Sequence, residues 1–351
     1  MSVRRFVPVA AAALAIGAAT SSVAAQPAPK PAPTVTTRPM PASAPAAPAL
    51  APTPALPFVP SNEARSVLAY YYAWWNPGDF SRTLYQAPTA YSSDEAAVKQ
   101  QHIQQAQAAG IDGFIVSWYG NGDRTDRNLA QLLDLGARTG FRVTIHFETP
   151  HFWGADDVVA QLRAFYDNRA NHPALVHYQG RPVIFFWRAG IFDNSTWSAI
   201  RNQVDPGHAA AWIADGDNFN ILAGDAWDGI SPYAIAWSGN PAGQLPSWAA
   251  KAAAAAPDKL YIPPVSPGCN DSAARSVTCV QDRGDGSYYQ ATWAGAMASN
   301  PGWAVTVSTF NEWMEATQIE PSVQYGDLYL QITRQNADAF HASAGPDAVS
   351  S

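Results

Sequence analysis

Residues 111–149, which read IDGFIVSWYGNGDRTDRNLAQLLDLGARTGFRVTIHFET, contain the alternation that decides the fold. Two apolar runs, 111–120 and 141–149, have the length and composition of buried strands. The segment between them, 125–140, has a helical pattern and ends at Gly140, a residue that commonly terminates helices. A strand, a helix and a second strand in this order predict a βα repeat with parallel strands.

The same alternation continues along the chain from residue 62 to residue 345. Eight strand candidates, most followed by a helix, predict a single (β/α)8 barrel domain of the α/β class. An open doubly wound sheet is the alternative, but neither a GxGxxG nor a GxxxxGK loop is present to support it. The strand candidates are 66–74, 111–120, 141–149, 181–189, 208–215, 226–236, 258–268 and 302–310.

The N-terminal 61 residues have the composition of a targeting segment followed by a spacer. Arg4 and Arg5 precede the apolar run 7–19, and small residues lead up to a cleavage site near Ala25, as in secretory signal peptides. The apolar run is too short for a membrane anchor, which needs about 20 residues. Residues 26–61 are rich in Pro and Ala and predict an extended linker, with a processing remnant as the alternative. We therefore expect export to the periplasm or the medium.

Charge and aromatic content indicate the kind of partner. Without Arg4 and Arg5 the formal net charge changes from -7 to -9, and the absence of basic runs argues against nucleic acid. The chain contains 13 Trp and 14 Tyr, residues that stack on sugar rings as well as fill cores. We expect a monomer that has no membrane span and binds a polysaccharide or oligosaccharide.

Two cysteines, Cys269 and Cys279, lie close together in a loop-like stretch. In an exported chain this spacing favours a disulfide that closes the loop over two free thiols. A metal site built on two cysteines would need further ligands, and none is evident at a suitable spacing. The histidines form no HExxH motif, and the chain has no GxSxG elbow of the kind found in esterases. We expect no metal and no cofactor.

The chemistry is expected at the C-terminal ends of the strands, where barrels of this class carry their active sites. The last strand candidate, 302–310, leads directly into Glu312 and Glu315 in a chain with only 14% charged residues. Two carboxylates that face one glycosidic bond can divide acid and base roles if their environments separate their pKa values. The alternative is that both glutamates are solvated loop charges.

The segment FNEWMEATQIEP, residues 310–321, resembles the FNEWHEGTQIEP signature of glycoside hydrolase family 99, the endo-acting α-mannosidases and α-mannanases. Other family motifs have similar stretches in the same order along the chain. These are YYYAWWNPG at 70–78, AGIDGFIVSWYG at 109–120, HFETP at 146–150, VSPGCND at 265–271 and RGDGSYY at 283–289.

The resemblance implies an exported, retaining, endo-acting hydrolase of an α-linked polysaccharide. In this family one glutamate acts as a base on the substrate 2-hydroxyl, which attacks the anomeric carbon to give a 1,2-anhydro intermediate. The other glutamate protonates the leaving oxygen and then activates water. Carried over by position, Glu312 is the base and Glu315 is the general acid/base.

Five further positions match the family less firmly. Tyr72 and Trp118 match cleft aromatics, with a role in the strand core as the equal alternative. Glu148 matches an acidic cleft residue that contacts a substrate hydroxyl, with a structural hydrogen bond as the alternative. Tyr233 takes the place of a cleft tyrosine, and Asn311, next to the base, is expected to orient it.

Several positions depart from the family pattern. Met314 replaces a His, Ala316 replaces a Gly and Cys269 replaces a Tyr, while Glu320 of the signature is expected to be structural. The change at Met314 removes a polar contact close to the acid/base, which puts the mannan specificity in doubt. The alternatives are therefore a hydrolase similar to the α-1,3-glucanases of glycoside hydrolase family 71, and a barrel that binds glycans without cleaving them.

Overall fold

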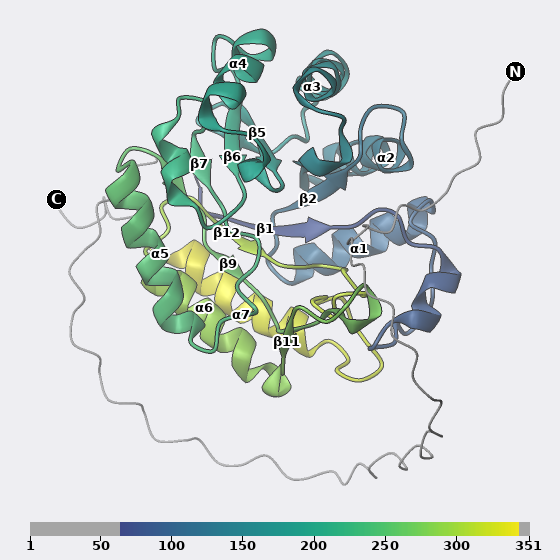
Figure 1. Ribbon diagram of the computed structural model, residues 1–351. Coiled ribbons are helices and arrows are strands. Elements are labelled where there is room, and N and C mark those ends of the chain that lie inside the picture. The colour runs from purple at the N-terminus through teal and green to yellow at the C-terminus, as the bar shows by residue number, and fades with distance from the viewer. Residues whose placement is uncertain (1–63, 344–351) are drawn as a thin grey trace, which may run out of the picture. The chain divides into compact units, whose positions relative to one another are not determined.

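The computed structural model describes residues 64–343 (Figure 1). The predicted signal peptide and the Pro/Ala-rich linker lie outside these residues. A parallel sheet forms the centre of the described part, in the order β8-β7-β6-β5-β3-β2-β1-β12-β9. Its strands are β1 (Ser66–Tyr71), β2 (Gly113–Trp118), β3 (Arg142–Phe147), β5 (Arg181–Phe186), β6 (Ala211–Ala214), β7 (Gly229–Ile230), β8 (Leu260–Tyr261), β9 (Pro264–Val265) and β12 (Ala304–Val307).

The two ends of this sheet belong to one stretch of chain, so the sheet closes on itself. β8 pairs with β7 through Leu260 and Gly229, and β9 pairs with β12 through Pro264 and Thr306. Only two residues separate β8 from β9. One extended segment therefore fills the seventh of eight strand positions. The predicted (β/α)8 barrel is confirmed, and the open doubly wound sheet is wrong.

Residues 64–343 form seven α-helices. These helices lie around the strands (Figure 1). Sequence signals explain where α2 begins and ends: the Asp123 carboxylate accepts a hydrogen bond from the amide of Thr125, and Gly140 follows in the left-handed conformation. The helices are α1 (Ala96–Ala108), α2 (Arg124–Thr139), α3 (Ala155–Arg169), α4 (Asn194–Val204), α5 (Pro241–Ala255), α6 (Ser287–Ala298) and α7 (Leu328–Ala342).

Short elements complete the described chain. β4 (His177–Tyr178) pairs antiparallel with β5, and β10 (Cys269–Asn270) pairs antiparallel with β11 (Val280–Gln281). Short 3-10 helices occupy Pro77–Arg82, Thr149–His151, Ala189–Ile191, Phe219–Ala223, Asp271–Ala273 and Gly284–Gly286. No helix within residues 64–343 combines the length and the apolar character needed to span a bilayer.

Alternate residues of each strand face two different layers of the core. On β1, Val67 and Tyr71 belong to the layer between the strands and the helices, together with Ile103 of α1. Leu68 and Tyr70 belong to a second cluster, inside the ring, which also takes in Phe185 and Ile213 from the strands opposite. This alternation follows from the two-residue repeat of a strand. It fills the centre of the barrel with side chains.

The two ends of the described chain meet where β1 begins. The Arg65 guanidinium donates a hydrogen bond to the Ser343 hydroxyl and lies 4.9 Å from the centre of the Phe340 ring. Asp112 joins the same region, because its carboxylate accepts from the amide of Val67 and lies 2.8 Å from the His341 ring. The C-terminal end of α7 therefore packs against the start of β1, and the buried rings of Tyr178 and Trp303, with centres 4.9 Å apart, close the inner cluster at this end of the barrel.

Candidate active site

A cavity of about 450 Å³ opens at the C-terminal ends of the strands. Five of the residues predicted from the sequence line it together: Tyr72, Glu148, Tyr233, Glu312 and Glu315. The remaining lining residues include the aromatic side chains Trp74, Trp75, Tyr119 and Trp187, together with Asp79, Arg82, His146, Ala273, Ala274, Arg275 and Met314. The cavity is thus bordered by aromatic rings and carboxylates, as a site for a neutral sugar requires.

A second cavity of about 460 Å³ adjoins the first. The two share Trp187, Tyr233, Arg275 and Glu315. The second cavity continues over the exposed Trp237 and the loop between the two cysteines. A chain molecule can therefore extend to both sides of Glu315.

Glu312 is buried in the first cavity, with 6% of its surface exposed. Its amide donates to the Thr309 hydroxyl at 2.8 Å, and one of its carboxylate oxygens accepts from the Met314 amide at 3.0 Å. Burial, and then the negative charge of Glu315, raise the pKa of Glu312 well above its usual value. Glu312 therefore binds a proton readily.

Glu315 has a different environment three residues further along. Its side chain is 22% exposed and its carboxylate contacts the guanidinium of Arg275. Its carbonyl oxygen accepts from the amide of Asn270 at 2.8 Å, which joins the two loops. The two glutamates thus differ in burial and in the presence of a cation.

The loop that carries Arg275 is closed by a disulfide between Cys269 and Cys279, whose Cα atoms are 5.9 Å apart. The predicted disulfide is therefore confirmed. Inside the loop the Asp271 carboxylate accepts from the amide of Thr278 at 2.9 Å and from that of Cys279 at 3.1 Å. The same carboxylate lies 3.1 Å from Arg275 Nε. Arg275 is thus held between Asp271 and Glu315.

Two further acids follow other strands, and of these Glu148 lines the first cavity. Glu148, after β3, is buried and accepts a hydrogen bond from the Ser117 hydroxyl. Burial raises the pKa of Glu148 to about 8, and burial raises the pKa of Asp215, after β6, to about 6. His146 Nδ1 lies 3.8 Å from Glu148, and burial lowers the pKa of His146 to about 3, so the imidazole is neutral at pH 7.

Aromatic side chains form one wall of the first cavity. The Tyr72 and Tyr233 hydroxyls lie 2.7 Å apart. The rings of Trp74 and Tyr119 are stacked with their centres 5.5 Å apart, and the rings of Tyr119 and His151 are stacked with their centres 4.6 Å apart. This series of parallel rings offers flat faces of the kind on which sugar rings stack.

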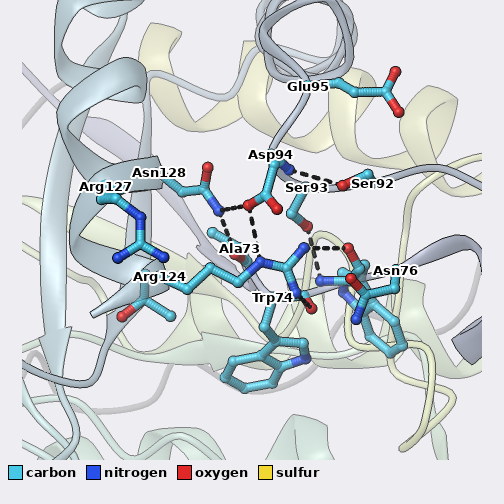
Figure 2. A network of polar contacts seen from close by, with 12 residues as sticks. Ala73, Trp74, Asn76, Ser92, Ser93, Asp94, Glu95, Arg124, Arg127 and Asn128 are labelled. Atoms are coloured by element: carbon cyan, nitrogen blue, oxygen red, sulfur yellow. Dashed lines mark hydrogen bonds and ion pairs between the residues drawn. The ribbon is translucent and has the colours of Figure 1, made fainter. Parts of the chain in front are cut away.

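A polar network behind this wall fixes the chain that carries Trp74 (Figure 2). Arg124, at the start of α2, donates to the carbonyl oxygens of Trp74 and Trp75 and pairs with Asp94 at 2.8 Å. Asn128, one turn later, donates to the carbonyl oxygen of Ala73 at 2.8 Å and to Asp94 at 2.9 Å. The first turns of α2 thus determine the position of the chain that carries Trp74, and with it the position of the aromatic wall.

Two predicted residues lie outside both cavities. Trp118 is buried, its indole nitrogen donates to Asp126 at 3.1 Å, and its ring packs against Phe147, so the structure places it in the core rather than the cleft. Asn311 is also buried; it accepts from the amide of Tyr72 at 2.7 Å and donates to the carbonyl oxygen of Tyr72 at 3.0 Å. Asn311 therefore fixes Tyr72 and the backbone next to Glu312.

Sequence reasoning did not include Arg275 among the site residues, and it had little means of finding it. Arg275 is 40 positions away from Glu315 and lies seven residues beyond the end of the predicted strand 258–268. The one available signal was the pair of cysteines around it, which indicated a closed loop but not its direction. Trp74 and Tyr119 were recognisable as aromatics at strand ends.

Comparisons with known proteins bear on the family and the fold of the chain. The family model for glycosyl hydrolase family 99 matches residues 62–339. A glycoprotein endo-alpha-1,2-mannosidase of Mus musculus is 26% identical over 302 residues, which cover 75% of this chain and 65% of that protein. A glycoprotein endo-alpha-1,2-mannosidase-like protein of Homo sapiens is 26% identical over 304 residues, covering 75% of this chain and 66% of that protein.

The chain thus spans about two thirds of the length of these curated relatives. Among solved structures, a family 99 endo-alpha-mannosidase of Bacteroides thetaiotaomicron superposes with a TM-score of 0.71 at 23% identity. The superposition covers 79% of this chain and 98% of that one. It supports the barrel fold.

Proposed function

The chain belongs to glycosyl hydrolase family 99, and on this premise we propose that it is an exported, retaining, endo-acting hydrolase of α-mannose-containing glycans. One observation carries the proposal: Glu312 and Glu315 face one cavity from environments that differ in burial and charge. Unequal environments are what allow two carboxylates to act as acid and base on the same bond. The second cavity supports endo action, because it provides space for the glycan beyond Glu315.

In the proposed reaction, ionised Glu312 takes the proton of the sugar 2-hydroxyl. The freed oxygen bonds to the anomeric carbon while the glycosidic bond breaks, and protonated Glu315 gives its proton to the leaving oxygen. Water then attacks the anomeric carbon and Glu315 takes a proton from it. The bond to the 2-oxygen breaks, and this oxygen takes back its proton from Glu312. One water is consumed and both glutamates return to their starting forms.

The other lining residues bind the substrate in this scheme. The stacked rings of Trp74 and Tyr119 provide an apolar face for a sugar, and Glu148 lies where it can contact a hydroxyl group. Glu148 is expected to donate as well as accept hydrogen bonds, because burial raises its pKa to about 8 and leaves it protonated at pH 7. Met314 lines the same cavity and supplies no polar side-chain contact apart from its weakly accepting sulfur.

The test is reducing-sugar release from a panel of α-mannans and α-glucans. We expect release from an α-mannan, and a loss of at least about 100-fold in kcat for Glu312→Gln and for Glu315→Gln, the range of general acid–base catalysis. Glu95→Gln is the matched control, because Glu95 is exposed at the start of α1 and outside both cavities. Wild-type activity in either cavity variant would contradict the assignment.

The panel also separates the alternatives. Release from α-1,3-glucan but not from α-mannan would contradict the mannose proposal in favour of the glucanase alternative. Binding of a glycan without release would indicate the non-catalytic barrel. A 2-deoxy substrate tests the mechanism, since its normal turnover would exclude attack by the 2-oxygen. Export after cleavage near Ala25 and a monomeric state stay predictions from the sequence.

A further inference from the structure

The two cavities differ in which of the two glutamates lines them. Glu312 lines the first cavity, whereas Glu315 lines both. In the proposed reaction Glu312 acts on the 2-hydroxyl of the reacting sugar, and Glu315 acts on the leaving oxygen. The reacting sugar therefore occupies the first cavity, and the leaving group extends from Glu315 into the second.

Trp237 presents an exposed ring to the second cavity. Its side chain lines this cavity, and 54% of its surface is exposed. The indole nitrogen donates to the carbonyl oxygen of Ala234 at 2.9 Å. The ring contacts that of the buried Trp248 of α5, with the two centres 5.9 Å apart. The polar atom of Trp237 is therefore satisfied by the protein, while the exposed part of the ring is available to a ligand.

The chain that carries Trp237 is held by neighbouring elements. The Tyr288 hydroxyl, at the start of α6, lies 3.1 Å from the carbonyl oxygen of Ile235 and 2.9 Å from that of Ser238. The amide of Ser238 donates to the carbonyl oxygen of Ile235 at 2.9 Å and closes the turn around Trp237. Because ring and backbone are fixed without a ligand, stacking on Trp237 requires little further ordering of the protein.

Most polar side chains of the second cavity are already paired within the protein. The Ser308 hydroxyl donates to the carbonyl oxygen of Tyr233 at 2.8 Å. The buried Asp271 carboxylate accepts from the amides of Thr278 and Cys279. Such groups have little hydrogen-bonding capacity left for the hydroxyl groups of a sugar.

The two arginines of this cavity do not define a hydroxyl configuration either. Arg275 contacts the carboxylates of Asp271 and Glu315. Arg188 is exposed, and a long exposed side chain keeps the rotamer freedom to follow a hydroxyl group in different positions. The fixed surface that the second cavity offers a sugar is therefore the ring of Trp237.

The first cavity differs, because unpaired polar groups belong to its wall. His146 lines it, and both ring nitrogens of His146 are buried without a hydrogen-bond partner among residues 64–343. Glu148 lines it as well and holds a proton at pH 7, since burial raises its pKa to about 8. A site with buried polar groups rejects a ligand that leaves them unpaired, whereas an apolar surface discriminates weakly between similar ligands.

We propose that the second cavity is a leaving-group subsite in which a sugar stacks its C–H face on Trp237, and that this subsite accepts hexoses irrespective of the configuration of their free hydroxyl groups. The inference rests on the proposed roles of Glu312 and Glu315, which place the leaving group there. Specificity is then unequal across the cleaved bond. The expected substrates are glycans in which the reacting α-mannose unit is followed by mannose or by another hexose.

The kinetic test uses three α-mannosides that share the glycone part. Their leaving groups are methanol, mannose, and an epimer of mannose in which one free hydroxyl group is inverted. For the wild type we expect kcat/KM on the two sugar leaving groups to agree within about ten-fold. For Trp237→Ala we expect kcat/KM to fall on both of them by about ten-fold more than on the methyl glycoside, whose leaving group has no ring to stack.

Two results of this test would overturn the proposal. A wild-type preference of more than about ten-fold for one epimer would mean that the second cavity distinguishes hydroxyl configuration. A fall for Trp237→Ala that is equal on all three substrates, or no fall at all, would mean that Trp237 does not bind the leaving group.

Two further variants serve as controls. Trp237→Phe keeps an aromatic face and should retain most of the wild-type preference for the sugar leaving groups. Trp153→Ala removes a Trp that is 96% exposed and lies outside both cavities, and it should match the wild type on all three substrates. Thermal unfolding of each variant identifies any that fail to fold.

A direct readout uses the wild-type chain and needs no catalysis. Fluorine NMR of protein labelled with fluorinated tryptophan reports on the indole rings, and the Trp237→Phe variant assigns the signal of Trp237. We expect this signal to shift on addition of an α-mannobiose and, to a similar extent, of an α-glucobiose. No shift with either disaccharide, or a shift with one alone, would overturn the inference even if glycans are cleaved. If the signal shifts with both and no glycan is cleaved, the proposed function fails while the subsite stands.

Discussion

Acidic side chains lie at both ends of the barrel, and the two ends differ in the cations that contact these acids. At the N-terminal ends of the strands, Asp228 lies 2.7 Å from Arg181 and 2.8 Å from Arg201. At the C-terminal ends, Glu312 and Glu148 are buried. None of the ion pairs among residues 64–343 joins either of these two glutamates to an arginine. At the closed, N-terminal end the negative charge of Asp228 is thus neutralised by arginines. At the open, C-terminal end Glu312 and Glu148 have no such cation in contact.

The pKa values respond in opposite directions. Burial alone would raise the pKa of Asp228, but the two arginines and the Trp212 amide lower it below its usual value. Burial raises the pKa of Glu148 to about 8 because nothing cationic offsets it. The comparison indicates that the closed end contributes to stability. The open end keeps buried acids with raised pKa values, which lower stability but can act as proton donors or acceptors in catalysis.

The first prediction concerns the closed end, where a substitution removes the carboxylate that pairs with two arginines. Asp228→Asn leaves Arg201, which is 1% exposed, without the carboxylate between it and Arg181. We expect a loss of about 3 kcal/mol in the free energy of unfolding, measured with urea, and turnover per folded molecule within two-fold of wild type. Asp338→Asn, in an exposed pair with Arg334, should cost at most about 0.5 kcal/mol. Equal losses would contradict the distinction.

The second test follows stability with pH at the open end. A raised pKa means that folded Glu148 keeps a proton that the unfolded chain releases above its usual value of 4.5, so the wild type loses stability as the pH rises toward about 8. Glu148→Gln removes this dependence. We expect the variant to gain at least about 1 kcal/mol relative to wild type between pH 5 and pH 9 in urea unfolding. Parallel stability curves would contradict the raised pKa.

The third test concerns an arginine of the open end that binds mainly backbone carbonyls. Arg124→Gln should loosen the chain that carries Trp74 (Figure 2), and we expect KM to rise about five-fold with kcat within two-fold, as for weakened stacking on a sugar. Arg127→Gln, an exposed neighbour on α2 that donates to the Gly122 carbonyl, is the control. An equal rise in KM for the control would remove the special role of Arg124.

The sequence predicted the βα rhythm well because local signals determine it. The helix predicted at 125–140 is α2 (Arg124–Thr139), which differs from the prediction by one residue at each end. The stretch 226–236 was predicted as a strand, but only Gly229–Ile230 is assigned as β7. The predicted strand 258–268 is divided into β8 and β9, because it changes partner from β7 to β12 where the ring closes. Pairing across the ring is not visible in a local pattern.

The candidate site could be predicted where it follows the strand ends directly. Glu312, Glu315, Glu148, Tyr72 and Tyr233 line one cavity because the ring brings the C-terminal ends of its strands together. The side of the sheet to which the last side chains of a strand point was not predictable from the sequence. A shift of one residue reverses the side of the sheet, which explains why Trp118 lies in the core while its neighbour Tyr119 lines the cavity.

The contact between Arg65 and Ser343 has a consequence for engineering. The ring of eight βα units is interrupted at one place, and the two sides of that interruption already touch, on the face away from the cavity. A short peptide between them would give a circular permutant, with new ends opened at the exposed Gly207 turn between α4 and β6. Each strand would keep its neighbours, so the order in which the chain is synthesised could change while the active-site geometry is retained.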